Sequence, residues 1–186
     1  MLARRLIGVA CALRPRKQLE HLLEAAASLR FSDVRVVVAG GPVSGDERYA
    51  EELVARGHQL LGERFVHVGH LRDLRPFYNA LDLFVNTSQE EACSISVMEA
   101  LASGCPILGY PSTSVQEQVL PSGGEIVSQD SVPELGDALE RWLADPGRLC
   151  SARPLARKRA EDQFDIRALA AQLWGEYHSV YHDTLP

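Results

Sequence analysis

Basic residues are in short supply in this chain. Its 186 residues include 19 Lys and Arg against 25 Asp and Glu, which gives a formal net charge of −6 at pH 7. Proteins that bind nucleic acid usually present a basic surface, so the acidic balance argues against a nucleic-acid partner. The hydrophobic share of 46% still provides enough apolar side chains for the core of one domain.

Long apolar runs are missing as well. No run approaches the roughly 18 residues that a membrane-spanning helix requires, so none is expected within this sequence. The short apolar run near the N-terminus is interrupted by Arg14-Pro15-Arg16-Lys17, and no small-residue cleavage region follows it. We interpret this run as a buried first strand rather than as a signal peptide.

The sequence also lacks clusters of cysteine and histidine. Its four cysteines form no C-x-x-C pair, which is typical of reduced, mostly buried thiols in a cytosolic protein. They are Cys11, Cys93, Cys105 and Cys150. The six histidines make no ligand-spaced group with them. A cytoplasmic protein with no metal and no other cofactor is therefore expected.

What the sequence does contain is an alternation of short apolar runs with helical patterns. Strands are predicted at 6–13, 34–39, 65–68, 81–86, 106–109 and 125–127. Helices are predicted at 17–30, 46–61, 74–79, about 93–104, 115–119, 132–144, 147–161 and 166–181. Runs that are apolar throughout are typical of strands buried on both faces of a parallel sheet, and intervening helices indicate βαβ units.

The predicted fold class follows from that alternation. It is α/β, with a Rossmann-like doubly wound six-stranded parallel sheet followed by C-terminal helices. A single domain is expected over 1–186, with the sheet core at 1–128 and a helical tail at 129–186. In such a sheet the ligand lies beyond the carboxyl ends of the strands, so the loops that follow the strands are the candidate site.

One of these loops leads into the segment EEACSISVMEA, residues 90–100. A helix that begins there offers unpaired N–H groups and the positive end of its dipole to an anion. The small residues Ser94, Ile95 and Ser96 let a phosphate approach the backbone, while Glu91 and Glu99 can accept hydrogen bonds from sugar and ribose hydroxyls. Ser96 and Glu99 also fit an S-x-x-E capping box, which is a purely structural role, and both explanations stay open here.

The loop after the first predicted strand carries three cations within four residues. Arg14, Arg16 and Lys17 can neutralise a diphosphate at the ligand edge. The alternative is a solvated turn in which Pro15 opens the next helix. A cation at a helix N-terminus interacts unfavourably with the helix dipole. Because a purely structural turn would gain nothing from this small energetic cost, it favours a binding role.

The remaining loops give weaker signals. The run Gly40-Gly41-Pro42-Val43-Ser44-Gly45 is not G-x-G-x-x-G and lacks the GK[ST] of a P-loop, so neither a nicotinamide cofactor nor nucleotide hydrolysis is indicated. The alternative is a tight turn between strand and helix. Gly41 nevertheless remains a candidate for contact with a ligand. His70 lies on the same edge and can stack on a base, although a lone histidine is more often a surface residue.

Taken together, these residues resemble the C-terminal, nucleotide-sugar-binding half of retaining GT-B glycosyltransferases of family 4, the glycosyl transferases group 1 type. The resemblance covers nearly all of the chain. Its most specific element is the E-x7-E spacing from Glu91 to Glu99, followed by the family-like MEALASGCPI. Supporting elements appear in the family's order: Pro15-Arg16-Lys17 with Leu22-Leu23-Glu24-Ala25, then 65–74, then 81–88.

The resemblance implies a role for each matching residue. Glu91 and Lys17 would be the catalytic residues, with Glu91 on the transferred sugar and Lys17 on the diphosphate. Glu99 would bind the ribose. The implied donor-binding set is Arg14, Arg16, Lys17, Gly41, His70, Leu71, Ser94, Ile95, Ser96 and Glu99. The substrate would be a nucleoside-diphosphate sugar, with UDP or GDP as the nucleotide and no metal.

The sequence departs from the family in three places. Ala12 stands where the family usually has an arginine, so Arg14 or Arg16 would have to substitute for it. The usual E-G-F-G at the start of the motif reads Glu91-Ala92-Cys93-Ser94. The N-terminal GT-B domain, which binds the acceptor in this family, is absent from the sequence. The isolated chain is therefore expected to bind nucleotide weakly and to transfer no sugar.

Two further expectations concern partners. Membrane contact would be peripheral and would come only through a full-length protein. The last predicted helix carries Trp174, Tyr177 and Tyr181, and its apolar face is expected to be exposed or used in a dimer. Two alternative functions stay open: a nucleotide-sugar epimerase-like domain, and a non-catalytic nucleotide-binding subunit of a two-chain transferase.

Overall fold

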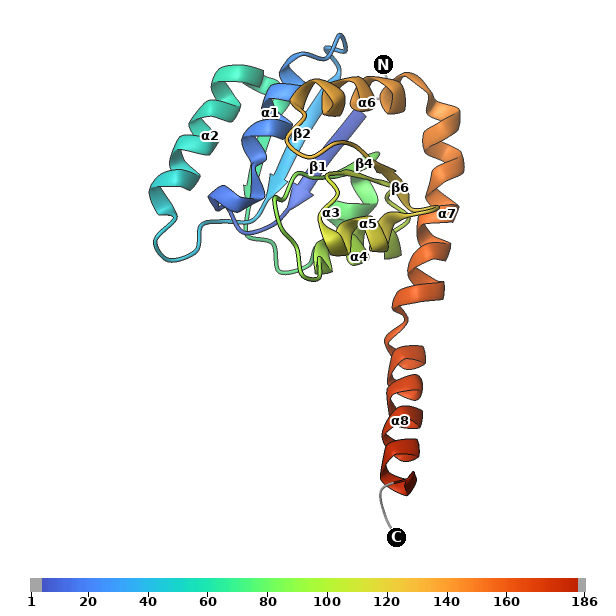
Figure 1. The fold of residues 1–186 in the computed structure, drawn as a ribbon. Coiled ribbons are helices and arrows are strands. Elements are labelled where there is room, and N and C mark those ends of the chain that lie inside the picture. Colours follow the sequence, from blue (N-terminus) through green and yellow to red (C-terminus); the bar gives the residue numbers. More distant parts are fainter. Residues whose placement is uncertain (1–4, 184–186) are drawn as a thin grey trace.

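The computed structural model describes residues 5–183 and contains one six-stranded sheet in which every paired strand is parallel. The strand order is β3-β2-β1-β4-β5-β6. The strands are β1 Arg5–Ala10, β2 Val34–Ala39, β3 Phe65–Gly69, β4 Leu83–Asn86, β5 Ile107–Gly109 and β6 Gly124–Ile126. This order confirms the predicted doubly wound sheet, and Figure 1 shows it between two layers of helices.

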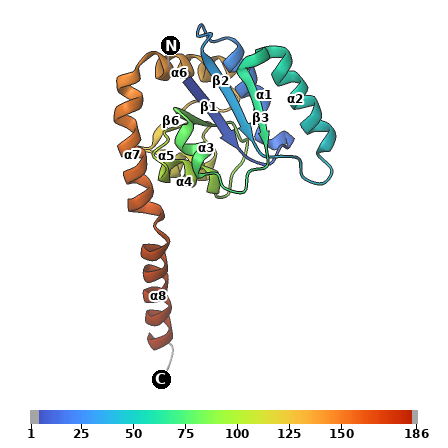
Figure 2. The same cartoon turned by 180° about the vertical axis from the view of Figure 1, so that it is seen from behind.

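The helices divide between the two faces of the sheet. One face carries α1 Leu19–Ala27, α2 Glu47–Leu61 and α6 Val132–Ala144. The other carries α3 Arg75–Ala80, α4 Ile95–Ala102, α5 Thr113–Val119 and α7 Pro146–Phe164. Figure 2 shows the sheet from behind, with α3 in front of it and α1 and α2 beyond it. Both faces are covered, which explains why the strands are mostly apolar.

The first crossover differs from its prediction. Strand β1 ends at Ala10 rather than at residue 13, and Leu13 forms only an isolated bridge with Pro42. A 3-10 turn over Pro15–Lys17 follows, and Gln18 has a left-handed backbone with φ of 47°. That backbone interrupts the helical path, so α1 begins at Leu19 rather than at Lys17. Residues 11–18 therefore form a loop beyond the carboxyl end of β1.

Gly40 holds this loop close to the end of β2. Its φ is 126°, and a Cβ added to it would lie 1.9 Å from the carbonyl oxygen of Cys11. Its own carbonyl oxygen is 2.8 Å from Nε2 of His67. The tight-turn interpretation is thus confirmed at Gly40, because only glycine allows the two loops to approach this closely.

Helix α7 fixes the layer formed by α3, α4 and α5. Three of its arginines donate hydrogen bonds to carbonyl oxygens at the C-terminal ends of those helices. Arg153 bonds Leu81, Arg157 bonds Ala102, and Arg159 bonds Glu117 and Gln118. A cation is favourable at the negative end of a helix dipole and satisfies carbonyls that lack partners. The N-terminal ends of α3, α4 and α5 face the carboxyl edge of the sheet. By bonding to their C-terminal ends, α7 holds these helices in position relative to that edge.

Helix α8, Ile166–Asp183, extends away from the body of the molecule (Figure 1). Its large apolar side chains are exposed, and Trp174, Tyr177 and Tyr181 are 68%, 66% and 64% exposed. This confirms the prediction that its apolar face is uncovered. None of the helices in residues 5–183 is long and apolar enough to cross a membrane.

The cysteine prediction needs a correction. All four thiols are free, as expected, but only Cys105 is buried. Cys11 is half-buried, whereas Cys93 and Cys150 are exposed. Cys93 lies in the loop that leads to α4, and Cys150 lies near the start of α7. Both side chains are exposed, so neither faces the core.

Candidate functional site

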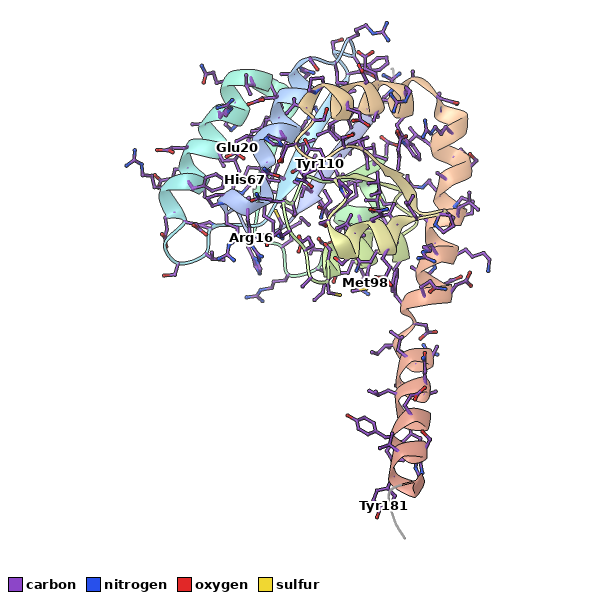
Figure 3. The ribbon with its side chains drawn as sticks, in the orientation of Figure 1. Arg16, Glu20, His67, Met98, Tyr110 and Tyr181 are labelled. Atoms are coloured by element: carbon purple, nitrogen blue, oxygen red, sulfur yellow. The ribbon has the colours of Figure 1, made fainter. Side chains whose placement is uncertain are left out.

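The sheet reverses its strand order between β1 and β4, and this is where ligands bind in open α/β sheets. The loops after these two strands are bonded to each other. Thr87 Oγ1 donates to the carbonyl oxygen of Lys17 at 2.8 Å, and the Gln89 N–H donates to that of Arg16 at 2.9 Å. Figure 3 shows Arg16 and Met98 along the same lower edge of the core, toward which β1 points.

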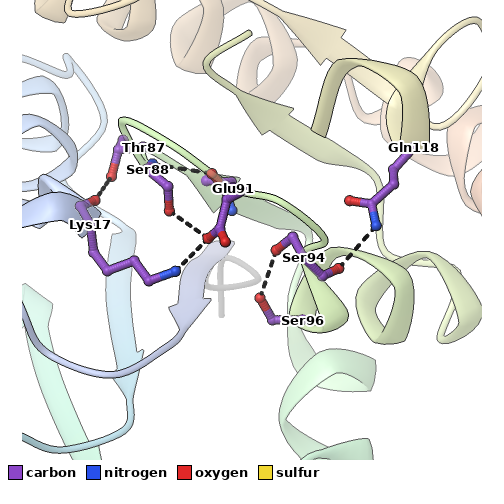
Figure 4. A network of polar contacts seen from close by, with 8 residues as sticks. Lys17, Thr87, Ser88, Glu91, Ser94, Ser96 and Gln118 are labelled. Atoms are coloured by element: carbon purple, nitrogen blue, oxygen red, sulfur yellow. Dashed lines mark hydrogen bonds and ion pairs between the residues drawn. The ribbon is translucent and has the colours of Figure 1, made fainter. Parts of the chain in front are cut away.

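Lys17 and Glu91 form an ion pair at this switch point (Figure 4). Lys17 Nζ donates to Glu91 Oε1, and Ser88 Oγ donates to the same oxygen at 2.9 Å. The two charged side chains are only 11% and 10% exposed. Charge-assisted bonds of this kind fix both groups in orientation. The structure therefore brings together the two residues for which the family resemblance implies a catalytic role.

The N-terminus of α4 lies beside this pair. Ser94 is the N-cap residue, and the first intrahelical bond runs from the Met98 N–H to its carbonyl oxygen at 3.2 Å. The N–H groups of Ile95, Ser96 and Val97 consequently have no partner within the helix. They lie at the helix end for which the sequence predicts anion binding.

The capping-box interpretation is wrong. Ser96 is the second residue of α4 rather than its N-cap, and its hydroxyl lies 3.3 Å from that of Ser94 (Figure 4). The carboxylate of Glu99 does not reach back to the helix start, because Oε2 accepts a hydrogen bond from Tyr78 at 2.8 Å. From α5, Gln118 Nε2 donates to the Ser94 carbonyl at 3.3 Å and supports the N-cap from outside.

Two pockets share Leu74, the residue that precedes α3. The pocket of about 520 Å³ is lined by Arg72, Asp73, Leu74, Arg75, Tyr78, Asn79, Glu99, Ala102, Ser103 and Arg157. The pocket of about 600 Å³ is lined by Ala10, Cys11, Ala12, Ala39, Gly40, Gly41, Pro42, Val43, His70, Leu71 and Leu74.

Three sequence-predicted donor residues, Gly41, His70 and Leu71, line the larger pocket together. A Cβ added to Gly41 would meet nothing within 4 Å, so the space beside its backbone is open. Glu99 lines the neighbouring pocket instead. These four predicted donor residues line the two pockets, whereas the other six, which are Arg14, Arg16, Lys17, Ser94, Ile95 and Ser96, line neither.

The predicted arginines are placed differently from Lys17. Arg14 Nε lies 3.3 Å from Oδ2 of Asp46, the residue that precedes α2. Arg16 is exposed at the carboxyl edge. Ala12, which stands where the family has an arginine, lines the larger pocket with a short apolar side chain. Lys17 is therefore the cation that the structure fixes at the switch point.

Cys11 lies near the ion pair, but its thiol is expected to be unreactive. Burial raises the pKa of its thiol to about 12, with Lys17 opposing and Glu91 reinforcing the rise. A thiol with so high a pKa stays protonated at neutral pH and is a poor nucleophile. Over residues 5–183, no group of three His, Cys, Asp or Glu side chains is arranged to hold a metal ion.

Sequence reasoning missed three residues that shape this site. Ser88 received no role of its own from the sequence, although a polar residue just past a buried strand on the ligand edge was a usable signal. Tyr78 and Gln118 gave no signal, because each acts through a partner more than twenty positions away.

Comparison with known proteins decides the family. The profile of the family described as "Glycosyl transferases group 1" matches residues 3–161. The chain belongs to this family. The resemblance inferred from the E-x7-E segment is therefore confirmed at the level of the family.

Relatives within this glycosyltransferase family extend the match. The chain is 26% identical over 186 residues to the "Lipopolysaccharide core biosynthesis mannosyltransferase LpsB" of Rhizobium meliloti (strain 1021), covering 96% of this chain and 52% of the relative. The chain spans about half the length of the curated relatives it matches.

Solved structures share the fold. The complex of Anabaena Alr3699/HepE with UDP and glucose has a TM-score of 0.87 at 23% identity, covering 95% of this chain and 49% of that one. The C-terminal domain of a glycosyl transferase group 1 family protein (LpcC) from Francisella tularensis has a TM-score of 0.78 at 22% identity, covering 87% of each chain. At these identities the likeness establishes the GT-B type of fold.

Proposed function

We propose that this chain is the donor-binding domain of a glycosyltransferase that transfers a hexosyl group from a nucleoside-diphosphate sugar with retention. The observation that carries the proposal is the Lys17–Glu91 pair beside the N-terminus of α4 at the switch point. An ammonium and a row of free helix N–H groups are suited to bind a diphosphate. The UDP bound to Anabaena HepE and the mannosyltransferase name of the rhizobial relative are consistent with such a donor.

The proposed chemistry is electrostatic. When the bond between the sugar and the diphosphate breaks, negative charge develops on the leaving nucleotide. Lys17 and the N–H groups of Ile95 and Ser96 stabilise that charge because they are already oriented before the donor binds. Glu91, held by Lys17 and Ser88, contacts the transferred sugar. These groups supply the positive charge themselves, so we propose no metal cofactor.

The two pockets divide the nucleotide between them. We assign the base to the pocket lined by Gly41, His70 and Leu71, and the ribose to the pocket lined by Glu99. Leu74, which lines both, then lies at the junction of base and ribose. Arg16, exposed at the same edge, is available to the diphosphate once the donor is bound.

The acceptor is assigned to the part of the relatives that this chain does not match. On this division of labour, the 186-residue chain binds nucleotide and transfers no sugar. The exposed apolar face of α8 is then a contact surface, and in the isolated chain we expect it to support a dimer. The four free thiols are consistent with a cytoplasmic location.

Calorimetric titration with UDP, GDP and ADP tests the proposal. We expect weak, saturable binding of at least one of them by the 186-residue chain. The absence of heat, together with the absence of thermal protection by all three nucleotides, would contradict donor binding. Sugar transfer by the purified chain would instead refute the assignment of the acceptor and of turnover to another part of the protein.

A further inference from the structure

Tyr78 lies in the pocket that Glu99 lines, and the proposed chemistry gives it no role. Its side chain is 1% exposed. The ring makes an edge-on contact with Phe77 at 5.5 Å between centroids and a tilted contact with Phe84 on β4 at 5.8 Å. Packing between α3 and the sheet therefore fixes the phenol in one position.

The hydroxyl of this fixed ring is directed at Glu99. It donates to Oε2 at 2.8 Å, whereas Oε1 has no hydrogen-bond partner among residues 5–183. Burial, followed by the hydrogen bond to Glu99 and the charge of Glu99, raises the pKa of Tyr78 well above its ordinary value. The phenol consequently remains protonated, and remains a hydrogen-bond donor, at neutral pH.

We propose that Tyr78 is a positioning residue for ribose recognition: its hydroxyl fixes the Glu99 carboxylate through Oε2, which leaves Oε1 to accept a hydrogen bond from a ribose hydroxyl. The inference rests on the proposed function, because it takes the ribose of a nucleoside diphosphate as the ligand of Glu99. It adds the residue that orients the acceptor group.

The reason for such a residue is the freedom of the glutamate. Glu99 is exposed on the surface of α4, and an exposed glutamate samples several rotamers. Ordering it when the ligand binds reduces affinity. Tyr78 removes part of this ordering in advance, so its loss weakens only those ligands that bond to Glu99.

The test compares UDP with 2′,3′-dideoxy-UDP, which lacks both ribose hydroxyls, by calorimetry on the 186-residue chain; GDP and 2′,3′-dideoxy-GDP are run alongside. We expect the unmodified chain to bind the ribonucleotide about tenfold more tightly, as one or two hydrogen bonds to a charged group would give. Tyr78→Phe should lower the ribonucleotide affinity about threefold to fivefold and leave the dideoxy affinity unchanged. In a Glu99→Ala background, Tyr78→Phe should have no further effect.

Tyr49 provides a matched control. Its hydroxyl donates to Glu20 Oε2 at 3.0 Å, which is the same kind of bond made between α2 and α1, and neither residue lines the two pockets. Tyr49→Phe should leave both affinities unchanged. A Tyr78→Phe variant that loses both affinities equally, or keeps the unmodified ratio, would overturn the inference alone. Failure of the unmodified chain to bind any of the four nucleotides would overturn the proposed function beneath it.

Discussion

Glu91 and Glu99 lie in one short segment but are held in opposite ways. Glu91 belongs to a loop, its side chain is 10% exposed, and one of its oxygens accepts from both Lys17 and Ser88. Glu99 belongs to an exposed face of α4 and is held by a single neutral phenol. Folding has therefore buried two opposite charges, those of Lys17 and Glu91, at one end of the segment. The charge of Glu99, at the other end, remains exposed to water.

This difference separates stability from binding. A charge removed from water must keep its partner, so the Lys17–Glu91 pair is expected to matter for folding as well as for the donor. An exposed carboxylate can be deleted at little cost to the fold, so Glu99 is expected to matter mainly for the ligand. Substitutions at the two ends should consequently give different combinations of lost stability and lost affinity.

The largest effect is expected from breaking the ion pair. Lys17→Met leaves the Glu91 carboxylate without its cation, and the free energy of unfolding should fall by about 3 kcal/mol. Denaturation in urea at pH 7 measures this loss. Nucleotide binding should disappear in the same variant, because Lys17 is also the proposed diphosphate ligand.

A double variant and a control sharpen the result. Lys17→Met combined with Glu91→Met removes both charges, so stability should largely return while nucleotide binding does not. Arg48→Met breaks an ion pair on the outside of α2 whose side chains are 90% and 63% exposed, and it should have no measurable effect. A stable single variant that still binds UDP would show that the pair serves neither folding nor the donor.

An intermediate effect is expected at the other end of the segment. Glu99→Ala removes one hydrogen bond, that of Tyr78, and should lower the free energy of unfolding by about 1 kcal/mol. Nucleotide affinity should fall by about tenfold, which is about 1.4 kcal/mol, if the carboxylate binds ribose. Urea denaturation and calorimetry on the same preparation separate the two quantities.

Glu90 gives the control for charge alone. It is an exposed carboxylate in the same segment, so Glu90→Ala changes the net charge by the same amount as Glu99→Ala. It should leave both stability and affinity unchanged. Equal losses of affinity in the two variants would indicate a general effect of charge and would remove Glu99 from the proposed ribose site.

The sequence could predict the sheet because periodicity is a local property. Strand β4 is buried at every position and β2 at four of its six positions, and the places of both strands in the sequence follow directly from residue types. The pairing of Lys17 with Glu91 was reachable too, because the ends of neighbouring strands meet at one edge. The resemblance to the family supplied which side chains at that edge to consider together.

Tertiary partners were out of reach of the same reasoning. Tyr78 lies 21 positions from Glu99, and an apolar pattern assigns it to the core without revealing where its hydroxyl points. Gln118 supports Ser94 from a helix 24 positions away. The left-handed backbone of Gln18 was also invisible, because a non-glycine residue seldom adopts it.

The capping box shows how a local pattern fails. The chain contains S-x-x-E six times, and two of these, Ser96–Glu99 and Ser131–Glu134, can be compared at the starts of α4 and α6. Ser131 is the N-cap of α6 and accepts a hydrogen bond from the Glu134 N–H. At α4 the helix begins two residues earlier than the motif requires, so Ser96 lies inside it. The same sequence pattern therefore has different roles in the two helices. The role depends on the residue at which the preceding loop ends and the helix begins.

The smallest effect follows from that contrast. Ser96→Ala removes no helix cap and should change the free energy of unfolding by less than about 0.5 kcal/mol. Ser131→Ala, in the same four-residue pattern, removes a side-chain cap and should lower it by about 1 kcal/mol. Urea denaturation of the two variants provides the comparison. A loss at Ser96 as large as that at Ser131 would mean that Ser96 does organise the start of α4, and it would contradict the assignment of Ser94 as the N-cap.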